Sequence, residues 1–409
     1  MQIYRVGGAV RDKLLNYPCH ENDWVVVGSS PEEMVALGYR SVGQDFPVFI
    51  DPRSGEEYAL ARTERKSGVG YGGFTFHTSP DISLEDDLIR RDLTINAMAE
   101  SADGTITDPY GGQQDLENKV LRHVSDAFAE DPLRVLRVAR FAARYAHLGF
   151  TLAPETLQLM CTIVNRGEMT ALVAERVWKE TQRALCERSP DVFIETLKSC
   201  GALAVLLPEV EALFGIEQRA DFHPEIDTGI HTLMALQQSA LLTNKATIRF
   251  TVLVHDLGKA ITPKEILPRH TGHEARGLPL VKQVCDRLKV PNQHRQLAMV
   301  VTEYHLMCHK SLEFKPENLL KLLTVIGALK SAEKLDDFLL CCMADAKGRK
   351  GLEKQEYAPN RYLREAREAA IAVQVTDLVA SGIKGADIGT QLKQRQIDAL
   401  SEFKQHYQP

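Results

Sequence analysis

Hydrophobic and polar positions follow two different patterns along the chain. Up to about residue 125, short apolar runs such as IYRV, DWVVV and FPVFI alternate with helical segments. Beyond that point apolar residues recur at helical spacing. Prolines interrupt this second pattern at Pro154, Pro190, Pro208, Pro224, Pro291, Pro316 and Pro359. We therefore predict an α+β fold class, in which a small mixed sheet with helices precedes an all-α body.

Two local signals define elements of the first part. SSPEEMVALGY predicts a helix in which Ser30 is the N-cap, Pro31 lies in the first turn and Gly38 ends the helix. FPVFI and EYALART flank the turn IDPRSGEEY, which predicts an antiparallel hairpin. TINAMAE is a further strand candidate.

Composition restricts the cellular setting and the mode of binding. The chain has 409 residues, no run close to 20 apolar residues, and an amino terminus without the apolar stretch of a secretory signal. Its eight cysteines have no CxxC spacing, which favours reduced thiols. We expect a cytoplasmic protein that does not associate with membranes. The net charge of −6 means that nucleic acid must be bound by local basic faces.

The motif GGAVRD suits an anion site. A Gly-Gly pair between a strand and a helix lets the backbone approach a phosphate, and Arg11 stands one turn further on. Such a pair is most often only a tight turn. Glu21 and Asp23 then stand two apart at the start of a strand, so their side chains leave the same face and can share a divalent cation. Taken alone, they are more simply solvated charges.

Arginines mark two further segments. In LEDDLIRRDLTINAMA, Ser83 caps a helix that we expect to end in Arg90, Arg91 and Asp92, either as surface ion pairs or as a triphosphate clamp. EDPLRVLRVARFAARY predicts a helix with Pro132 in its first turn. Its arginines fall within an arc of about 120°; they are Arg134, Arg137, Arg140 and Arg144. A solvated basic face explains these arginines but not the acid at the start of the helix.

These motifs, with DPYGGQQDL, occur in an order that resembles class II tRNA nucleotidyltransferases, the CCA-adding enzymes. The whole chain resembles the bacterial multifunctional CCA proteins. The resemblance implies a polymerase-β-like head in which Glu21 and Asp23 bind Mg²⁺ and assist attack of an RNA 3′ hydroxyl on the α-phosphate of a nucleoside triphosphate. It also implies that five residues contact the nucleotide: Gly8, Arg11, Arg91, Arg137 and Arg140.

The resemblance further assigns Asp131 and Arg134 to base recognition. Cytosine and adenine both present an exocyclic amine beside a ring-nitrogen acceptor, whereas uracil and guanine present a carbonyl beside an N–H. An aspartate and an arginine therefore fit C and A and leave the wrong bases with unmatched polar groups. The glycine-rich segment 67–73 is implied to be the loop that helps the switch from C to A. Glu21 departs from the usual DxD, so we expect a working enzyme with shifted metal geometry.

A second constellation lies in the helical body. His255-Asp256 in IRFTVLVHDLGK, with His231 upstream and Asp345 downstream, resembles the H…HD…D pattern of HD-domain phosphohydrolases, which hold a transition metal. Nickel (Ni²⁺) is a candidate metal, and His273 and His305 are further candidate ligands. The implied activities are 2′,3′-cyclic phosphodiesterase, 2′-nucleotidase and phosphatase. We interpret His223, His270, His294 and His309 as structural or surface histidines.

We therefore divide the chain into a nucleotidyltransferase head (1–125), a helical neck (126–220), an HD-type phosphohydrolase domain (221–349) and a tRNA-binding tail (350–409). The expected function is template-independent addition and repair of the tRNA 3′-terminal CCA. The expected partners are the tRNA 3′ end, ATP and CTP, and the chain is expected to be a monomer or a homodimer.

Alternatives remain at this point. A poly(A) polymerase shares the head motifs, although the strongly basic tail expected of it is absent. An HD phosphohydrolase with a degenerate RNA-binding head is suggested by Glu21. A pure RNA-binding scaffold would not need the acid–arginine pair at positions 131 and 134.

Overall fold

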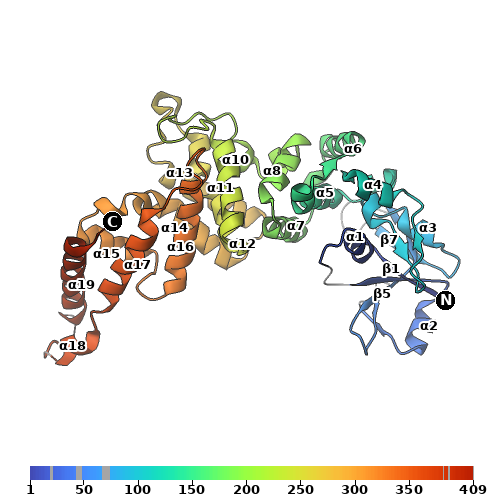
Figure 1. Cartoon of the computed structure of the whole chain (residues 1–409), viewed down its shortest axis with the longest axis horizontal. Coiled ribbons are helices and arrows are strands. Elements are labelled where there is room, and N and C mark those ends of the chain that lie inside the picture. The colour runs from blue at the N-terminus through green and yellow to red at the C-terminus, as the bar shows by residue number, and fades with distance from the viewer. Residues whose placement is uncertain (19–21, 43–47, 67–73, 381, 386, 409) are drawn as a thin grey trace. The chain divides into compact units, whose positions relative to one another are not determined.

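A computed structural model describes residues 1–18, 22–42, 48–66, 74–380, 382–385 and 387–408 (Figure 1). The chain divides into two compact units, Met1–Leu206 and Leu207–Pro409. Among the described residues, no helix combines the length and the apolar character that a membrane crossing requires.

The first unit contains a seven-stranded sheet of order β3-β4-β5-β2-β1-β8-β9. Its strands are β1 (Gln2–Val6), β2 (Asp23–Val27), β3 (Arg40–Ser41), β4 (Val48–Ile50), β5 (Glu57–Leu60), β8 (Ala99–Glu100) and β9 (Ile106–Thr107). The pair β2–β5 is parallel and the other pairs are antiparallel. The mixed sheet is thus confirmed, and so is the hairpin, in which Phe49 of β4 lies opposite Tyr58 of β5.

Two strand predictions need correction. EYALART is broken after Leu60, because β6 (Arg62–Lys66) leaves the large sheet and pairs with β7 (Phe74–Thr78). TINAMAE is only a strand at its end, β8. Residues Thr94–Asn96 form a 3₁₀ turn, in which the Ala97 N–H donates to the Thr94 carbonyl at 2.9 Å.

The helices before residue 125 follow their local signals. They are α1 (Gly8–Leu14), α2 (Pro31–Ala36), α3 (Leu84–Leu88) and α4 (Gly112–Asn118). At α2, Ser30 and Glu33 form a reciprocal capping box, and Gly38 follows with φ of +90°, as predicted. The helix capped by Ser83 is shorter than expected. It ends at Leu88, so Arg90 and Arg91 lie in the turn that follows it.

The chain beyond residue 125 is helical, as predicted, with one exception. It forms α5 (Leu133–Tyr145), α6 (Pro154–Asn165), α7 (Ala174–Cys186), α8 (Pro190–Ser199) and α9 (Ala202–Leu206). The exception is β11 (Thr151–Leu152), which pairs in parallel with β10 (Val120–Leu121). The Thr151 N–H donates to the Lys119 carbonyl at 2.9 Å, so this strand exists because a remote segment supplies its acceptor.

The described residues of the second unit form helices joined by loops, with one isolated bridge between Glu217 and Asp227. Its helices are α10 (Pro208–Glu211), α11 (Thr228–Leu242), α12 (Ala246–Val254), α13 (His273–Arg287), α14 (Asn292–His309), α15 (Pro316–Val325), α16 (Ala332–Lys347), α17 (Ala358–Ile371), α18 (Val375–Ala380) and α19 (Asp387–His406). Their apolar stripes form one core that includes Leu319, Phe338 and Leu363. The buried thiols of Cys341 and Cys342 belong to this core, where burial raises their pKa. No disulfide forms among the described cysteines.

Candidate functional site

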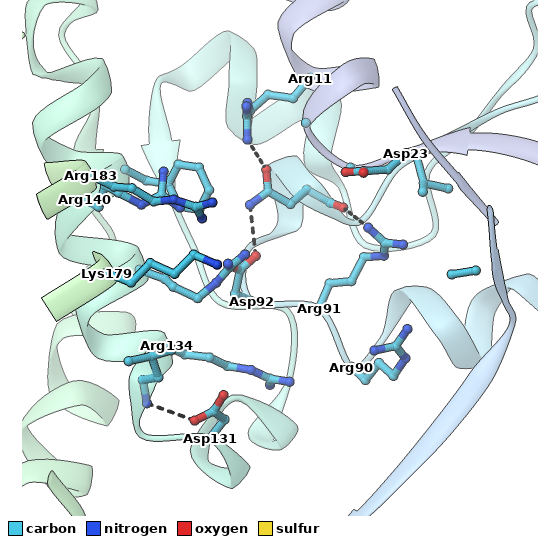
Figure 2. Close-up of a pocket in the computed structure, with 18 of the residues that line it drawn as sticks. Arg11, Asp23, Arg90, Arg91, Asp92, Asp131, Arg134, Arg140, Lys179 and Arg183 are labelled. Carbon is cyan, nitrogen blue, oxygen red and sulfur yellow. Dashed lines mark hydrogen bonds and ion pairs between the residues drawn. The ribbon is translucent and has the colours of Figure 1, made fainter. Parts of the chain in front are cut away.

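A cavity of about 1100 Å³ lies within the first unit. Its walls come from the sheet, the turns after β1 and α3, and the helices α5 and α7 (Figure 2). Eleven basic and five acidic side chains line it, although the chain as a whole is acidic. The basic residues are Arg11, Arg62, Arg90, Arg91, Arg134, Arg137, Arg140, Arg144, Arg176, Lys179 and Arg183. The cavity is therefore the local basic surface that an anionic ligand requires.

Asp23 stands at the sheet side of the cavity. It begins β2 and lies opposite Val6, directly beside the Gly-Gly turn. Gly7 has φ of +65°, and a Cβ at this position would lie 2.9 Å from Arg91 Nη1 and 4.0 Å from Asp23 Oδ2. A side chain would thus intrude between these two groups. Gly8 begins α1. Glu21, the predicted partner of Asp23, lies outside the described residues, as does the glycine-rich segment 67–73.

Arg11 is fixed by contacts on three sides. Its Nη1 donates to Asn96 Oδ1 at 2.5 Å and its Nε donates to Asp12 Oδ1 at 2.8 Å. The guanidinium also lies over the rings of Phe141 and Tyr145, at 5.2 and 5.3 Å from their centroids. The side chain reaches the cavity in one defined position.

Arg90 and Arg91 share Asp87, which is fully buried. Arg90 Nη2 lies 2.5 Å from Asp87 Oδ1, and Arg91 Nη2 lies 3.1 Å from Oδ2. Burial raises the pKa of Asp87, but the charges of Arg90 and Arg91 outweigh it and lower the pKa below its ordinary value. Because the shared acid is buried and both arginines line the cavity, this is not an exposed surface ion-pair cluster.

The arginines of α5 do not form a solvated face. Arg134 and Arg140 are each 8% exposed. Arg137 donates from Nε to Asp92 Oδ2 at 2.7 Å, and Arg140 donates from Nε to Glu180 Oε2 at 2.8 Å. Further along, Arg144 Nη2 donates to an oxygen of Asp12 at 3.3 Å. The stripe predicted from the sequence is therefore a row of oriented cations on the cavity wall.

Asp92 is the buried anchor of Arg137. Its Oδ1 also accepts a hydrogen bond from Asn96 Nδ2 at 2.9 Å. Burial alone would raise the pKa of Asp92, yet the charge of Arg137 and these hydrogen bonds lower it well below its usual range. Asp92 is thus ionised and holds the Arg137 guanidinium at the cavity.

Asp131 and Arg134 lie one turn apart where η3 (Asp126–Glu130) meets α5, and both line the cavity. Asp131 Oδ1 accepts from the Leu133 N–H at 3.1 Å, and its Oδ2 lies 2.8 Å from Arg176 Nη2 of α7. Arg134 Nη1 donates to the Ala127 carbonyl at 2.6 Å. Each side chain is held by a different neighbour.

Helix α7 supplies residues that the sequence reasoning missed. Lys179 and Arg183 face the cavity beside Arg140 (Figure 2), and Arg176 and Glu180 pair with Asp131 and Arg140. Their spacing in AERVWKETQRALC, at intervals of three and four, places them on one helix face and was the available signal.

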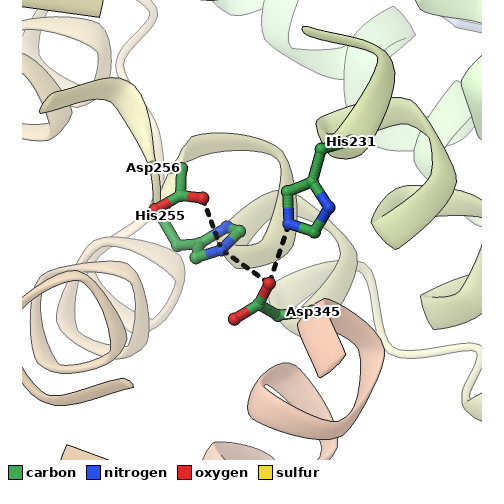
Figure 3. Close-up of side chains that lie close together, drawn as sticks. All are labelled: His231, His255, Asp256 and Asp345. Carbon is green, nitrogen blue, oxygen red and sulfur yellow. Dashed lines mark hydrogen bonds and ion pairs between the residues drawn. The ribbon is translucent and has the colours of Figure 1, made fainter. Parts of the chain in front are cut away.

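The second unit brings the predicted histidine and aspartate residues together (Figure 3). His231 comes from α11, His255 and Asp256 directly follow α12, and Asp345 comes from α16. Candidate ligand atoms of all four lie within 4.8 Å of one another, and all four residues are buried. His231 Nε2 lies 2.8 Å from Asp345 Oδ1, and His255 Nε2 lies 3.4 Å from Asp256 Oδ2.

His273 and His305 form a neighbouring group that shares Asp256. Asp256 Oδ1 lies 3.1 Å from His273 Nε2 and 3.6 Å from His305 Nε2. The two Nε2 atoms are 3.2 Å apart. The structure thus places the six predicted residues in two adjacent groups that share Asp256.

The imidazoles at this centre are oriented for metal binding. The Nδ1 atoms of His255, His273 and His305 each face a backbone carbonyl, of Val252, His270 and Val301, at 2.8, 2.9 and 3.0 Å. A carbonyl only accepts, so Nδ1 carries the hydrogen and Nε2 directs its lone pair to the centre when the ring is neutral. His255 Nε2 is buried and has no hydrogen-bond partner among the described residues. The donor set therefore fits a transition metal.

The electrostatics of the centre also favour positive charge. Burial lowers the pKa of His255, but the charges of Asp256 and Asp345 outweigh it and raise the pKa to about 9. For His305 burial dominates and lowers the pKa to about 3. Lys259, missed in the sequence although it belongs to HDLGK, is buried with Nζ 2.7 Å from Asp256 Oδ2.

The remaining histidines differ in their surroundings: His270 and His294 have contacts outside the centre, whereas His223 shares Glu225 with His231 and forms a candidate metal-binding group with both. His223 Nδ1 lies 3.0 Å from Glu225, His270 contacts the Thr262 hydroxyl at 2.7 Å, and burial lowers the pKa of His294 to about 4. His309 lies beside the candidate metal centre. Its Nε2 lies 2.7 Å from Asp345 Oδ2, so it contacts a residue of the candidate metal centre.

Comparison with known proteins places these sites in a family context. Residues 3–122 match the model of the poly A polymerase head domain, and residues 149–214 match the model described as the probable RNA and SrmB-binding site of polymerase A. A multifunctional CCA protein of Acinetobacter baumannii is 58% identical over 408 residues, covering 100% of this chain and 99% of the relative.

Solved structures share the fold. The CCA-adding enzyme of Bacillus stearothermophilus in complex with CTP has a TM-score of 0.64 at 23% identity, over 98% of this chain and 89% of that one. The Thermotoga maritima CCA-adding enzyme complexed with tRNA has a TM-score of 0.63 at 18% identity, over 100% and 88% of the two chains. At these identities the likeness establishes the fold.

Proposed function

Since the chain belongs to the multifunctional CCA protein family, we propose that its arginine-lined cavity adds and repairs the 3′-terminal CCA of tRNA from CTP and ATP. The reaction releases pyrophosphate and needs no nucleic-acid template. The observation that carries this proposal is the arrangement within one cavity of Asp23 on the sheet side, the acid-anchored arginines of α5, and the pair Asp131–Arg134 where α5 begins.

The phosphates of the nucleotide occupy the arginine-rich part of the cavity. Arg11, Arg91, Arg137 and Arg140 contact them or the sugar, and the Gly7–Gly8 turn leaves room for the approach. Charge-assisted hydrogen bonds from guanidinium to phosphate are strong and directional. The partners of these arginines, such as Asp92 for Arg137 and Glu180 for Arg140, set the direction in which the donors point before the nucleotide arrives.

The base lies against Asp131 and Arg134. Asp131 accepts a hydrogen bond from the exocyclic amine, and Arg134 donates to the ring nitrogen. Cytosine and adenine satisfy both groups, whereas uracil and guanine leave an acceptor against an acceptor. The contacts from Arg176 to Asp131 and from Arg134 to the Ala127 carbonyl support a rigid recognition edge.

Asp23, with Glu21, holds the magnesium ion of the reaction. A carboxylate at the mouth of a phosphate-binding cavity is a hard oxygen ligand of the kind that Mg²⁺ binds. When bound, magnesium neutralises charge on the phosphates and favours deprotonation of the attacking hydroxyl. Asp23 lies close to Arg91 across the Gly7 position, so the metal ligand and the phosphate contacts converge on the same face of the turn.

We propose that the centre in the second unit is a phosphohydrolase site with 2′,3′-cyclic phosphodiesterase, 2′-nucleotidase and phosphatase activity. His231, His255, Asp256 and Asp345 hold a transition metal, for which nickel is a candidate, and His273 and His305 are further ligands that share Asp256. When bound, such a metal polarises a phosphoryl oxygen. Lys259 contacts Oδ2 of Asp256 and neutralises its charge, so Oδ1 is the oxygen of Asp256 that remains for the metal.

The domain assignment stays as proposed from the sequence, with a head (1–125), a neck (126–220), an HD-type domain (221–349) and a tail (350–409). The helices of the tail bind the tRNA through phosphate contacts, as recognition of duplex RNA by shape requires. The enzyme acts in the cytoplasm as a monomer or a homodimer.

The test offers tRNA that lacks its 3′ end together with each labelled nucleotide. We expect incorporation of CTP and then ATP, stopping after CCA, and rejection of UTP and GTP. Extended incorporation of ATP alone would identify a poly(A) polymerase instead. Failure to incorporate any nucleotide, with intact metal-stimulated phosphatase turnover, would identify an HD phosphohydrolase whose head only binds RNA.

A further inference from the structure

The segment between α16 and α17, residues 348–357, contacts the candidate metal centre from outside. Two of the four predicted ligands, His231 and Asp345, face each other with Nε2 and Oδ1 2.8 Å apart. Each of them has a second polar atom that points away from the centre. From each of these second atoms, a short series of polar contacts leads to residues 348–357.

On one side the contacts run from Asp345 through His309 to Tyr357. Asp345 Oδ2 lies 2.7 Å from His309 Nε2, and His309 Nδ1 lies 2.9 Å from the Tyr357 hydroxyl. An ionised carboxylate only accepts, so His309 carries its hydrogen on Nε2 and its Nδ1 accepts from the phenol. The Tyr357 hydroxyl also lies 3.2 Å from Cys308 Sγ, which is a second possible acceptor for its hydrogen. His309 thereby occupies Oδ2 of Asp345 and leaves Oδ1 for the centre.

On the other side the contacts run from His231 through Glu225 to Lys350. His231 Nδ1 lies 2.9 Å from Glu225 Oε1. The other oxygen, Oε2, accepts a hydrogen bond from the Lys350 backbone N–H at 3.2 Å. His231 and Glu225 are close enough for an ion pair, but their geometry is not that of a hydrogen bond. A carboxylate beside Nδ1 favours the hydrogen on that atom and leaves Nε2 as the ligand atom.

We propose that Glu225, His309 and Tyr357 are positioning residues of the metal centre, and that residues 348–357 couple metal affinity to the packing of the carboxyl-terminal helices. The inference rests on the proposed phosphohydrolase function. Tyr357 immediately precedes α17, so the position of that helix determines where the phenol lies. Since linkage is reciprocal, a metal bound at the centre stabilises this segment by the same free energy by which the segment strengthens metal binding.

Calorimetric titration of the metal-depleted full-length chain with NiCl₂ tests the proposal. We expect His309→Gln and Glu225→Gln to weaken nickel binding by about 10- to 100-fold, the usual effect of removing an outer partner of a ligand. Tyr357→Phe removes one hydrogen bond and should weaken binding by about 5-fold. Because Tyr357→Phe keeps the aromatic ring, it remains informative if His309→Gln unfolds.

Tyr362→Phe is the matched control. This tyrosine lies in α17, is 2% exposed, and has a hydroxyl without a hydrogen-bond partner among the described residues. The substitution removes the same atom from the same helical region, so nickel affinity should equal that of the wild type. A loss in Tyr362→Phe as large as in Tyr357→Phe would mean that general packing, and not the contact with His309, determines affinity, and would overturn the proposal.

Hydrogen exchange supplies the second measurement. Nickel should slow amide exchange in residues 348–357 of the wild type and have a smaller effect in His309→Gln. If His255→Ala binds nickel as tightly as the wild type, the metal centre itself is wrong and the proposed phosphohydrolase function fails. If His255→Ala loses the metal but His309→Gln, Glu225→Gln and Tyr357→Phe all bind like the wild type, only the positioning role fails.

Discussion

Substitution of Asp131 by asparagine tests base recognition most directly. Exchanging the charges at positions 131 and 134 would be less clean, because an arginine at 131 would meet Arg176, whose Nη2 now lies 2.8 Å from Asp131 Oδ2. Asparagine has the same shape as aspartate but presents an amide N–H₂ as well as an oxygen. It can therefore donate to the carbonyl of uracil or guanine, which the carboxylate cannot do.

The expected loss of discrimination follows from the free-energy cost of a buried polar group without a partner. Facing a carboxylate, the uracil carbonyl leaves a buried acceptor unsatisfied, which costs about 1–3 kcal/mol, or roughly 5- to 150-fold in discrimination. Asp131→Asn removes this penalty, so the preference for CTP over UTP in kcat/KM should fall by about one to two orders of magnitude. Its single oxygen cannot serve both the Leu133 N–H and Arg176, so kcat/KM for CTP itself should fall by about 10-fold.

Single-turnover incorporation on tRNA lacking its CCA end, with each nucleotide in turn, measures these ratios. The control is Asp126→Asn, which makes the same change on an exposed residue of η3 that does not line the cavity. Asp126→Asn should leave both the preference for CTP over UTP and kcat/KM for CTP unchanged. If Asp131→Asn folds, incorporates CTP and still rejects UTP as strongly as the wild type, Asp131 does not select the base.

The remaining predictions concern the anchors and the two metals. Asp92→Asn should lower the unfolding free energy of residues 1–206 by about 1.5–3 kcal/mol, measured by urea titration of tryptophan fluorescence, since Trp24 and Trp178 both lie in this unit. The folded-state pKa of Asp92 is lowered, so its contribution to stability is complete at pH 7 and is lost as the pH falls below the unfolded-state pKa of about 4. If the wild type and Asp92→Asn differed in unfolding free energy as much at pH 3 as at pH 7, this explanation would be wrong. Asp23→Asn should reduce nucleotide addition by roughly 100-fold or more, and wild-type rates in magnesium would refute its role. His255→Ala should abolish metal-stimulated phosphatase turnover but retain CCA addition. Loss of both activities would contradict the assignment of the two reactions to separate centres.

Elements that depend on neighbouring residues could be predicted from the sequence. The helix α2 was defined by Ser30, Pro31 and Gly38, and the hairpin β4–β5 by the turn between its strands. β11 could not be predicted, because two residues become a strand only when Lys119 and Leu121, far away in the sequence, supply hydrogen-bond partners. The 3₁₀ turn at Thr94–Asn96 was likewise hidden, since its composition is that of a strand.

In the candidate sites, too, residues within a local motif could be predicted and their remote partners could not. Residues that carry a recognisable motif, such as His255-Asp256 or the α5 arginines, were identified, and the structure brings them together. Their partners were not identified. Arg176 is 45 positions from Asp131 and His309 is 36 positions from Asp345, and no local periodicity connects such pairs. The contact of His309 with Asp345 could not be predicted for this reason.

The pairing of the cavity arginines explains how an acidic chain can bind a polyanion. A buried guanidinium without a counter-charge would be costly, so a cavity built only from such cations would destabilise the fold. Arg140, whose side chain is buried, avoids this cost through Glu180, and the partly exposed Arg137 is held by Asp92. A guanidinium has five N–H donors, and a carboxylate engages only one edge of the plane. Pairing therefore holds each arginine in place and still leaves N–H groups for phosphate oxygens, so the same acids that make burial tolerable also direct the charge into the cavity where we propose that the nucleotide binds.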